Sequence, residues 1–80
     1  MAIIEIKSPI PGTFYRKPSP ESPVFKDEGA EVVETDVIGL VEVMKTFHEI
    51  PASVVGKSIR FLIEDSEPVM AGQVIAEVEG

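Results

Sequence analysis

Lys45 is the residue of this chain whose type and position offer the clearest chemistry. It lies near the middle of an 80-residue sequence, in the stretch Val41-Glu42-Val43-Met44-Lys45-Thr46, with bulky apolar residues on both sides. A free lysine ammonium is protonated at neutral pH and is therefore not a nucleophile by itself. Another enzyme that presents an activated acyl group and removes the proton can convert it to an amide. An ordinary solubilising lysine at the tip of a turn is the alternative interpretation.

The other residue types offer little for catalysis or metal binding. A hydrolytic triad needs a nucleophile, a base and an orienting acid, but His48 is the only histidine and no serine lies in a nucleophile-elbow motif. The chain has no cysteine, no histidine pair and no glycine-rich phosphate loop. Glu64, Asp65 and Glu67 could hold a hard cation weakly, although an acidic turn explains them equally well. We therefore expect a non-catalytic protein without a metal.

Composition narrows the class of protein further. Fourteen acidic residues against seven basic ones give a net charge of -7, which disfavours nucleic-acid binding. No apolar run approaches the roughly 20 residues that span a bilayer, and the start lacks the basic region of a signal peptide. The absence of cysteine fits a reducing compartment. These features predict a soluble cytoplasmic protein that binds neither nucleic acid nor membrane.

The apolar pattern predicts β-strands, because it repeats every two residues. Ile4 and Ile6 alternate with polar residues, and residues 59–63 and 74–78 are expected to form similar half-buried strands. Residues 37–41 are nearly all apolar, which is typical of a strand covered on both faces. Seven prolines and six glycines punctuate these runs and exclude long helices. We expect an all-β sandwich or a flattened barrel.

The two halves of the chain are similar in sequence. Residues 27–32 match residues 64–69, and at the same offset Val37-Ile38-Gly39-Leu40-Val41-Glu42 matches Val74-Ile75-Ala76-Glu77-Val78-Glu79. Pro9-Ile10-Pro11-Gly12 matches Ser53-Val54-Val55-Gly56 at a larger offset. Duplication explains these matches, although chance similarity between two acidic β halves is an alternative. Two duplicated halves predict an approximate twofold axis.

The repeat predicts the positions of two features of the fold, a hairpin and an inserted loop. The join between the halves, residues 44–50, is expected to be a hairpin at one end, with both chain termini at the other. The difference between the offsets leaves about seven extra residues between Phe14 and Phe25, including Arg16-Lys17-Pro18-Ser19-Pro20-Glu21-Ser22. Prolines restrict φ, so this insertion should be a stiff loop without sheet pairing. Such a loop could simply cover an edge of the core or of a sheet.

Two separated motifs carry a family resemblance. Glu42-Val43-Met44-Lys45 resembles the Glu-Ala-Met-Lys signature around the biotinyl lysine of biotin-carrier domains. Upstream, Ser8-Pro9-Ile10-Pro11-Gly12-Thr13-Phe14-Tyr15-Arg16-Lys17-Pro18-Ser19-Pro20 is similar to the start of the biotin carboxyl carrier family of bacterial acetyl-CoA carboxylase type. Phe25 and an acidic, glycine-containing turn follow, as in that family. The resemblance extends from about Ile6 to Glu79 and has the family's order and spacing.

The resemblance implies a single domain over residues 1–80. Its expected fold is a flattened β-sandwich, also called a barrel-sandwich hybrid, of two four-stranded antiparallel sheets with quasi-twofold symmetry. A protruding "thumb" loop would cover about residues 16–24 and lean against the biotin ring, which separates this family from lipoyl domains. The implied cofactor is biotin, attached covalently to Lys45. The other implied cofactor-binding residues lie next to it in the hairpin or in the thumb loop: Glu42, Val43, Met44, Thr46, Lys17, Pro18 and Ser19.

The resemblance also implies a function and partners. A biotin protein ligase would load Lys45, and biotin carboxylase would carboxylate the attached biotin. The carrier would then bring carboxybiotin to a carboxyltransferase, by default that of acetyl-CoA carboxylase in fatty acid synthesis. The chain itself would be a non-catalytic subunit. The first methionine directly before a strand favours a free-standing carrier over part of a longer protein.

Other functions remain open at this level. The chain could serve a carboxylase that acts on another acyl-CoA, on urea or on an amide. It could also be a lipoyl-type carrier or an unmodified interaction module. Three residues depart from the family pattern, which has alanine at Val43, methionine at Thr46 and a hydroxyl residue at Lys17. We expect these departures to affect recognition by the ligase and the carboxylase partners, and Lys17 to donate a hydrogen bond to a ureido carbonyl.

Overall fold

The computed structural model describes residues 2–80 and contains β-strands joined by turns and loops. No helix that could cross a membrane occurs in this range. Pro9, Pro11, Pro18, Pro20 and Pro23 lie between strands, as the sequence predicts, but Gly12, Pro51 and Pro68 lie within strands, where the sequence predicted breaks. The strands are β1 (Ile3–Lys7), β2 (Gly12–Tyr15), β3 (Val37–Val43), β4 (Thr46–Pro51), β5 (Ile59–Phe61), β6 (Glu67–Val69) and β7 (Val74–Glu79).

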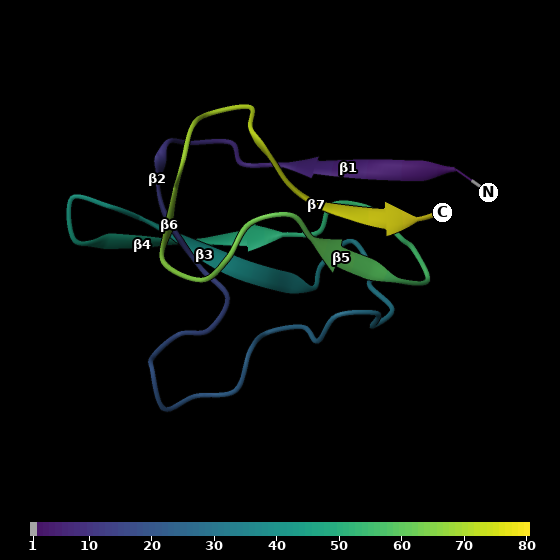
Figure 1. The fold of residues 1–80 in the computed structure, drawn as a ribbon, viewed down its shortest axis with the longest axis horizontal. Coiled ribbons are helices and arrows are strands. Elements are labelled where there is room, and N and C mark those ends of the chain that lie inside the picture. Colours follow the sequence, from purple (N-terminus) through teal and green to yellow (C-terminus); the bar gives the residue numbers. More distant parts are fainter. Residues whose placement is uncertain (1) are drawn as a thin grey trace.

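Two antiparallel sheets form the domain, and the predicted all-β sandwich is confirmed. One sheet has the strand order β1-β7-β5 and the other has the order β4-β3-β2-β6. The molecule measures 38 × 27 × 20 Å along its principal axes, so the sandwich is flattened. The β3–β4 hairpin extends to one end of the long axis and both termini lie at the other end, as predicted (Figure 1).

The first sheet has three strands, whereas four were predicted. The segment expected to supply the fourth strand does run beside β5. The amide of Gly29 donates to the carbonyl of Ile59 at 2.7 Å, and Val32 forms a single antiparallel bridge with Gly56. Residues 30–32 thus make one bridge, whereas the equivalent strand β6 makes a three-residue ladder with β2. The edge of this sheet is therefore held by isolated hydrogen bonds.

The two sheets nevertheless have equivalent layouts, which accounts for the similarity between the sequence halves. Strand β1 in one sheet has the position of β4 in the other, β7 has the position of β3, and β5 has the position of β2. The bridge at Val32 lies beside β5, where the other sheet has β6 beside β2. These equivalences have the offsets found in the sequence matches. Each sheet combines strands from both halves of the chain, which ties the halves together.

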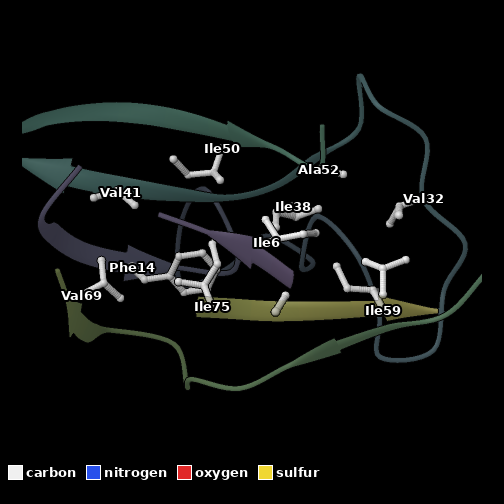
Figure 2. Close-up of a cluster of buried hydrophobic side chains, with 12 residues drawn as sticks. Ile6, Phe14, Val32, Ile38, Val41, Ile50, Ala52, Ile59, Val69 and Ile75 are labelled. Carbon is white, nitrogen blue, oxygen red and sulfur yellow. The ribbon is translucent and has the colours of Figure 1, made fainter. Parts of the chain in front are cut away.

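Side chains from both sheets meet in one core (Figure 2). Ile38 and Val41 are fully buried and Leu40 is nearly so, which confirms that β3 is covered on both faces. The half-buried alternation predicted for residues 74–78 is wrong, because Ile75 and Ala76 are both fully buried. β7 lies between β1 and β5, and the amide of the following loop residue Leu62 donates to the carbonyl of Ile75 at 2.9 Å. β7 is therefore hydrogen-bonded along both edges as the central strand of its sheet.

Candidate functional site

The β3–β4 hairpin closes with a two-residue turn formed by Met44 and Lys45. Val43 pairs with Thr46, so only these two residues lie between the strands. Their φ angles are 50° and 67°. Positive φ at both central positions defines a type I′ turn, which fits the strand twist but usually contains asparagine and glycine. Other side chains in this left-handed region cost roughly 1–2 kcal/mol per residue. The turn thus holds Lys45 in a conformation that its own side chain disfavours.

The side chains of the turn face solvent. Met44 is 91% exposed, and Lys45 and Thr46 are exposed as well. The ion pairs found within residues 2–80 join Lys26 to Asp36 and Arg60 to Glu77, so neither involves the Lys45 ammonium. Just before the turn, Val43 is partly buried and packs against the core. The strand is therefore anchored up to the edge of the turn, while the lysine is accessible from outside.

Glu42 lies on the outer face of the second sheet with two aromatic residues. It is paired with Phe47 across the hairpin, and the Tyr15 hydroxyl donates a hydrogen bond to its Oε1 at 3.3 Å. Desolvation and the negative charge of Glu42 raise the pKa of Tyr15 above its ordinary value. The tyrosine is therefore neutral near pH 7 and acts as a hydrogen-bond donor. This contact links β2 to the strand that leads into the turn.

Arg16 fixes the base of the predicted thumb loop, residues 16–24, which contains no strand. Its amide donates to Asp65 Oδ1 at 2.7 Å, and its carbonyl accepts a hydrogen bond from the Phe25 amide at 2.9 Å. Its guanidinium lies 4.2 Å from the centre of the Phe61 ring and donates to the Lys26 carbonyl at 3.1 Å. The backbone and side chain of one residue thus tie both ends of the loop to β5 and to the β5–β6 turn.

The thumb loop extends away from the two sheets and has a tight turn near its tip (Figure 1). The Ser22 amide donates to the Ser19 carbonyl at 3.1 Å, and the two hydroxyls are 2.7 Å apart. Pro18 and Ser19 are exposed, whereas Lys17 is half-buried. Proline before and after Ser19 restricts the backbone further. The loop is therefore a stiff projection, as the sequence predicts.

An open groove of about 480 Å³ separates the thumb loop from the hairpin strand. The loop supplies one wall, and Tyr15 and Phe47 supply an aromatic surface facing it. The ring centroids of these two residues are 6.2 Å apart, with an angle of 54° between the ring planes. The complete lining is Tyr15, Lys17, Pro18, Ser19, Pro20, Phe47, Asp65 and Ser66.

The predicted site residues thus form two groups. Lys17, Pro18 and Ser19 line the groove, while Val43, Met44, Lys45 and Thr46 lie at or beside the hairpin turn, and Glu42 contacts the groove through Tyr15.

Tyr15, Phe47 and Asp65 were not predicted as site residues. The sequence does contain a signal for Phe47, because it is an aromatic residue two positions after Lys45. In the structure its side chain is 55% exposed on the edge strand β4, which is unusual for a large apolar ring. Tyr15 and Asp65 come from distant segments, and only the pairing of β2 with β3 and β6 brings them here.

This arrangement displays an amine at the tip of the hairpin. His48 is exposed on the edge strand β4 and is paired with Val41. No group of three or more histidine, cysteine, aspartate or glutamate side chains within residues 2–80 could hold a metal ion. The hairpin therefore displays an exposed lysine with a groove beside it.

Fold and site together define a β-sandwich domain that displays one lysine on a strained hairpin turn. The family described as "Biotin-requiring enzyme", the biotin and lipoyl attachment domains, matches residues 4–78. The chain belongs to this family.

Several curated relatives are similar over most of this chain. Proteins named biotin carboxyl carrier protein of acetyl-CoA carboxylase are 39% identical over 74 residues in Pyropia yezoensis and 41% identical over 73 residues in Chlamydia muridarum. A protein of the same name from a Nostoc species is 35% identical over 77 residues. These matches cover 92%, 91% and 96% of this chain but 47%, 45% and 42% of the respective relatives. The chain therefore spans less than half the length of these relatives.

The groove has the chemistry that a biotin head requires. Biotin has a fused ring with apolar sides and a ureido group with amide-like polarity. The Tyr15 and Phe47 rings and two prolines provide apolar surface, while Lys17 and Ser19 provide hydrogen-bond donors. Two residues of extended strand span about 7 Å, so Phe47 lies well within reach of an arm attached at Lys45. The residues present fit this cofactor.

Proposed function

We propose that Lys45 carries covalently attached biotin and that this chain is the carboxyl-carrying domain of a biotin-dependent carboxylase. Acetyl-CoA carboxylase is the enzyme named for its relatives and is the assembly we assign. Residues 1–80 would form one attachment domain with its thumb loop at about residues 16–24. The chain would be a non-catalytic carrier in the cytoplasm, in keeping with its lack of cysteine.

The display of Lys45 carries this proposal. Its turn is strained, exposed and placed at the end of the molecule opposite the chain termini. Left-handed φ angles at two successive non-glycine residues are costly and tend to occur at functional sites. A lysine that served only solubility would not need this conformation. We infer that the turn presents the amine to a biotin protein ligase.

The groove favours biotin over lipoate as the attached group. A lipoyl arm ends in an apolar dithiolane ring without hydrogen-bonding edges. The thumb loop places Lys17 and Ser19 opposite an aromatic surface, which suits a ring with a polar ureido group. The thumb loop therefore supports biotin as the cofactor.

When bound, biotin supplies a ureido nitrogen that accepts and gives up a carboxyl group. The chain's own residues perform the placement. Lys45 provides the amide link and loses its charge, Val43 anchors the hairpin, and Tyr15 and Phe47 offer a surface for the ring. Biotin carboxylase and a carboxyltransferase would be the partners between which the arm moves.

The departures from the family pattern have different structural settings. Val43 packs against the core directly before the turn, so its larger side chain changes internal packing more than it changes the exposed surface of the tip. Thr46 is exposed opposite Val43 and offers a hydroxyl where the family has an apolar side chain. We expect Thr46 to affect contact with partner enzymes more than Val43 does.

Intact-mass spectrometry after co-expression with a biotin protein ligase tests the proposal. The wild-type chain should gain one biotinyl group and bind avidin, and Lys45→Arg should do neither. Lys57→Arg is the matched control, because Lys57 is also exposed, and it should be modified like the wild type. A lipoyl increment in the protein from its native host, or no modification of Lys45, would contradict the proposal.

A further inference from the structure

Lys17 is a cation in the groove without an ionic partner in the structure. Its side chain lines the groove and is half-buried. The two ion pairs within residues 2–80 involve Lys26 and Arg60 instead, and no hydrogen bond of the Lys17 ammonium occurs there. Placing a long charged side chain against proline and aromatic surface restricts its freedom. A plain hydroxyl or amide would serve a neutral ligand at lower entropic cost.

The carboxylates of Asp65, in the groove lining, and of Glu42, bonded to Tyr15, are already engaged by other donors. Asp65 Oδ1 accepts the Arg16 amide at 2.7 Å, and its Oδ2 accepts the Ser66 hydroxyl at 3.2 Å. Glu42 Oε1 accepts the Tyr15 hydroxyl at 3.3 Å. Neither carboxylate forms an ion pair with Lys17. The groove therefore combines an available ammonium, an apolar surface and one carboxylate, Asp65, that is held by other donors.

We propose that Lys17 pairs with the carboxylate that the biotin ring carries after loading, and that it holds this charged form in the groove. This inference rests on the proposed attachment of biotin to Lys45. The uncharged ring needs only hydrogen bonds, whereas the carboxylated ring has a negative charge that Lys17 can neutralise. Lys17 is thus a specificity-determining residue for the loaded form of the carrier.

The rate of CO₂ loss from the loaded chain measures the strength of this pairing. An ion pair stabilises the carboxylate more than the transition state for CO₂ loss, in which the charge moves onto the ring. The biotinylated chain would be loaded with ¹⁴C-bicarbonate, ATP and biotin carboxylase, and then separated from these reagents by gel filtration. The rate at which it releases labelled CO₂ would then be measured. Lys17→Met should lose its label about two- to five-fold faster than the wild type, as expected for a partly exposed pair.

Matched variants separate the possible causes. Lys17→Arg keeps the charge and should retain the wild-type rate, and Lys57→Met removes an exposed charge outside the groove and should also release CO₂ at that rate. ¹⁵N NMR of the Lys17 side chain should show a shift on loading that is absent with biotin alone. Equal or slower release from Lys17→Met, with biotin on Lys45 verified by mass, would overturn the role of Lys17. Absence of biotin on Lys45 would instead overturn the proposed function.

Discussion

The Phe47 ring packs against the Tyr15 ring with 6.2 Å between their centroids. The two residues come from β4 and β2, the strands on either side of β3. Tyr15 also donates to Glu42 on β3. The outer face of the second sheet therefore has a small cluster that spans three strands and forms one side of the groove. Its position next to the Lys45 turn connects the geometry of the hairpin to that of the groove.

Replacing both rings should reveal a coupling between them. We expect Tyr15→Leu and Phe47→Leu to interact by about 0.5–1.5 kcal/mol in a double-mutant cycle of unfolding free energy, as tilted aromatic pairs do. Urea denaturation of the wild type, both single variants and the double variant provides the four values. Additive losses within about 0.3 kcal/mol would show that the rings contribute independently.

Arg16→Met should loosen the thumb loop. The change removes the stacking on Phe61 and the hydrogen bond to the Lys26 carbonyl, which should lower the unfolding free energy by roughly 1–2 kcal/mol. It should also increase the backbone mobility of residues 17–22 in NMR relaxation. Arg60→Met is the control, because its pair with Glu77 is exposed and should contribute about 0–1 kcal/mol. An unchanged thumb loop in Arg16→Met would show that the prolines alone hold it.

Gly12 and Gly56 should tolerate no side chain. A Cβ at Gly12 would overlap the carbonyl of Glu42 and approach Val41 Cγ1 at 2.6 Å, and one at Gly56 would overlap Val78 and approach the carbonyl of Glu79 at 2.8 Å. Alanine at either position should lower the unfolding free energy by roughly 1–3 kcal/mol through overpacking. Urea denaturation measures the loss.

Gly72 provides the control for these substitutions. It has a φ angle of 83°, and a Cβ added there would meet no atom within 4 Å, so only backbone strain opposes a side chain. Asparagine tolerates the left-handed region and should therefore be accepted better than alanine at Gly72. Asparagine at Gly12 or Gly56 should be worse than alanine, because it is larger. The opposite ranking would show that close contact does not limit the side chain at Gly12 and Gly56.

The equivalence of Gly12 and Gly56 shows how much of the fold follows from the sequence. The two residues were matched by sequence alone, and they meet equivalent strands in the structure. The hairpin, the position of the termini and the loop insertion all follow from the same match. The count of strands does not, because residues 30–32 make a single bridge where the equivalent β6 makes a full ladder, and a hydrophobic pattern does not encode this difference in hydrogen bonding.

The groove was harder to predict than the turn. Lys45 is conspicuous because its motif is local, and one short stretch contains the lysine and its neighbours. The groove joins the thumb loop to Phe47 and to Asp65, which depends on the pairing of β2 with β3 and β6. Single-sequence patterns predict which residues form strands, but the lateral order of those strands depends on long-range packing. The thumb residues were therefore found by resemblance, and their partners only by structure.

Asp36 should make the fold sensitive to acid. The Val33 amide and the Lys26 ammonium lower the pKa of Asp36 below its ordinary value of 3.8. A carboxylate with a depressed pKa stabilises the folded state above its ordinary pKa, and this contribution disappears as the pH falls through the folded-state pKa. Asp36→Asn should therefore be less stable than the wild type at pH 7, and the difference should shrink below about pH 4.

Urea midpoints at pH 7, 5 and 3 would measure this dependence. Asp27→Asn is the control, since Asp27 is exposed and its carboxylate is in neither ion pair found within residues 2–80. Its difference from the wild type should be small at all three pH values. A constant deficit for Asp36→Asn across this range would assign its effect to lost packing and not to charge.

Met44→Gly should stabilise the protein while it impairs loading. Glycine adopts the left-handed φ of 50° at Met44 without the side-chain strain, although its greater freedom in the unfolded chain offsets part of the gain. We expect a net increase in unfolding free energy of up to about 1 kcal/mol. Met44 is 91% exposed, so the substitution removes almost no core packing. Met70→Gly is the control, because Met70 is 69% exposed but has no positive φ, and this change should be destabilising.

The same variant separates stability from recognition. If the ligase contacts the exposed methionine, Met44→Gly should be biotinylated more slowly on Lys45 than the wild type despite its higher stability, whereas Met70→Gly should be loaded normally. Initial rates of biotin incorporation, measured by intact mass with limiting ligase, provide the comparison. Faster loading of Met44→Gly would mean that the strain in the turn hinders the ligase. Loss of stability in Met44→Gly would show instead that the left-handed turn is not strained by its side chains.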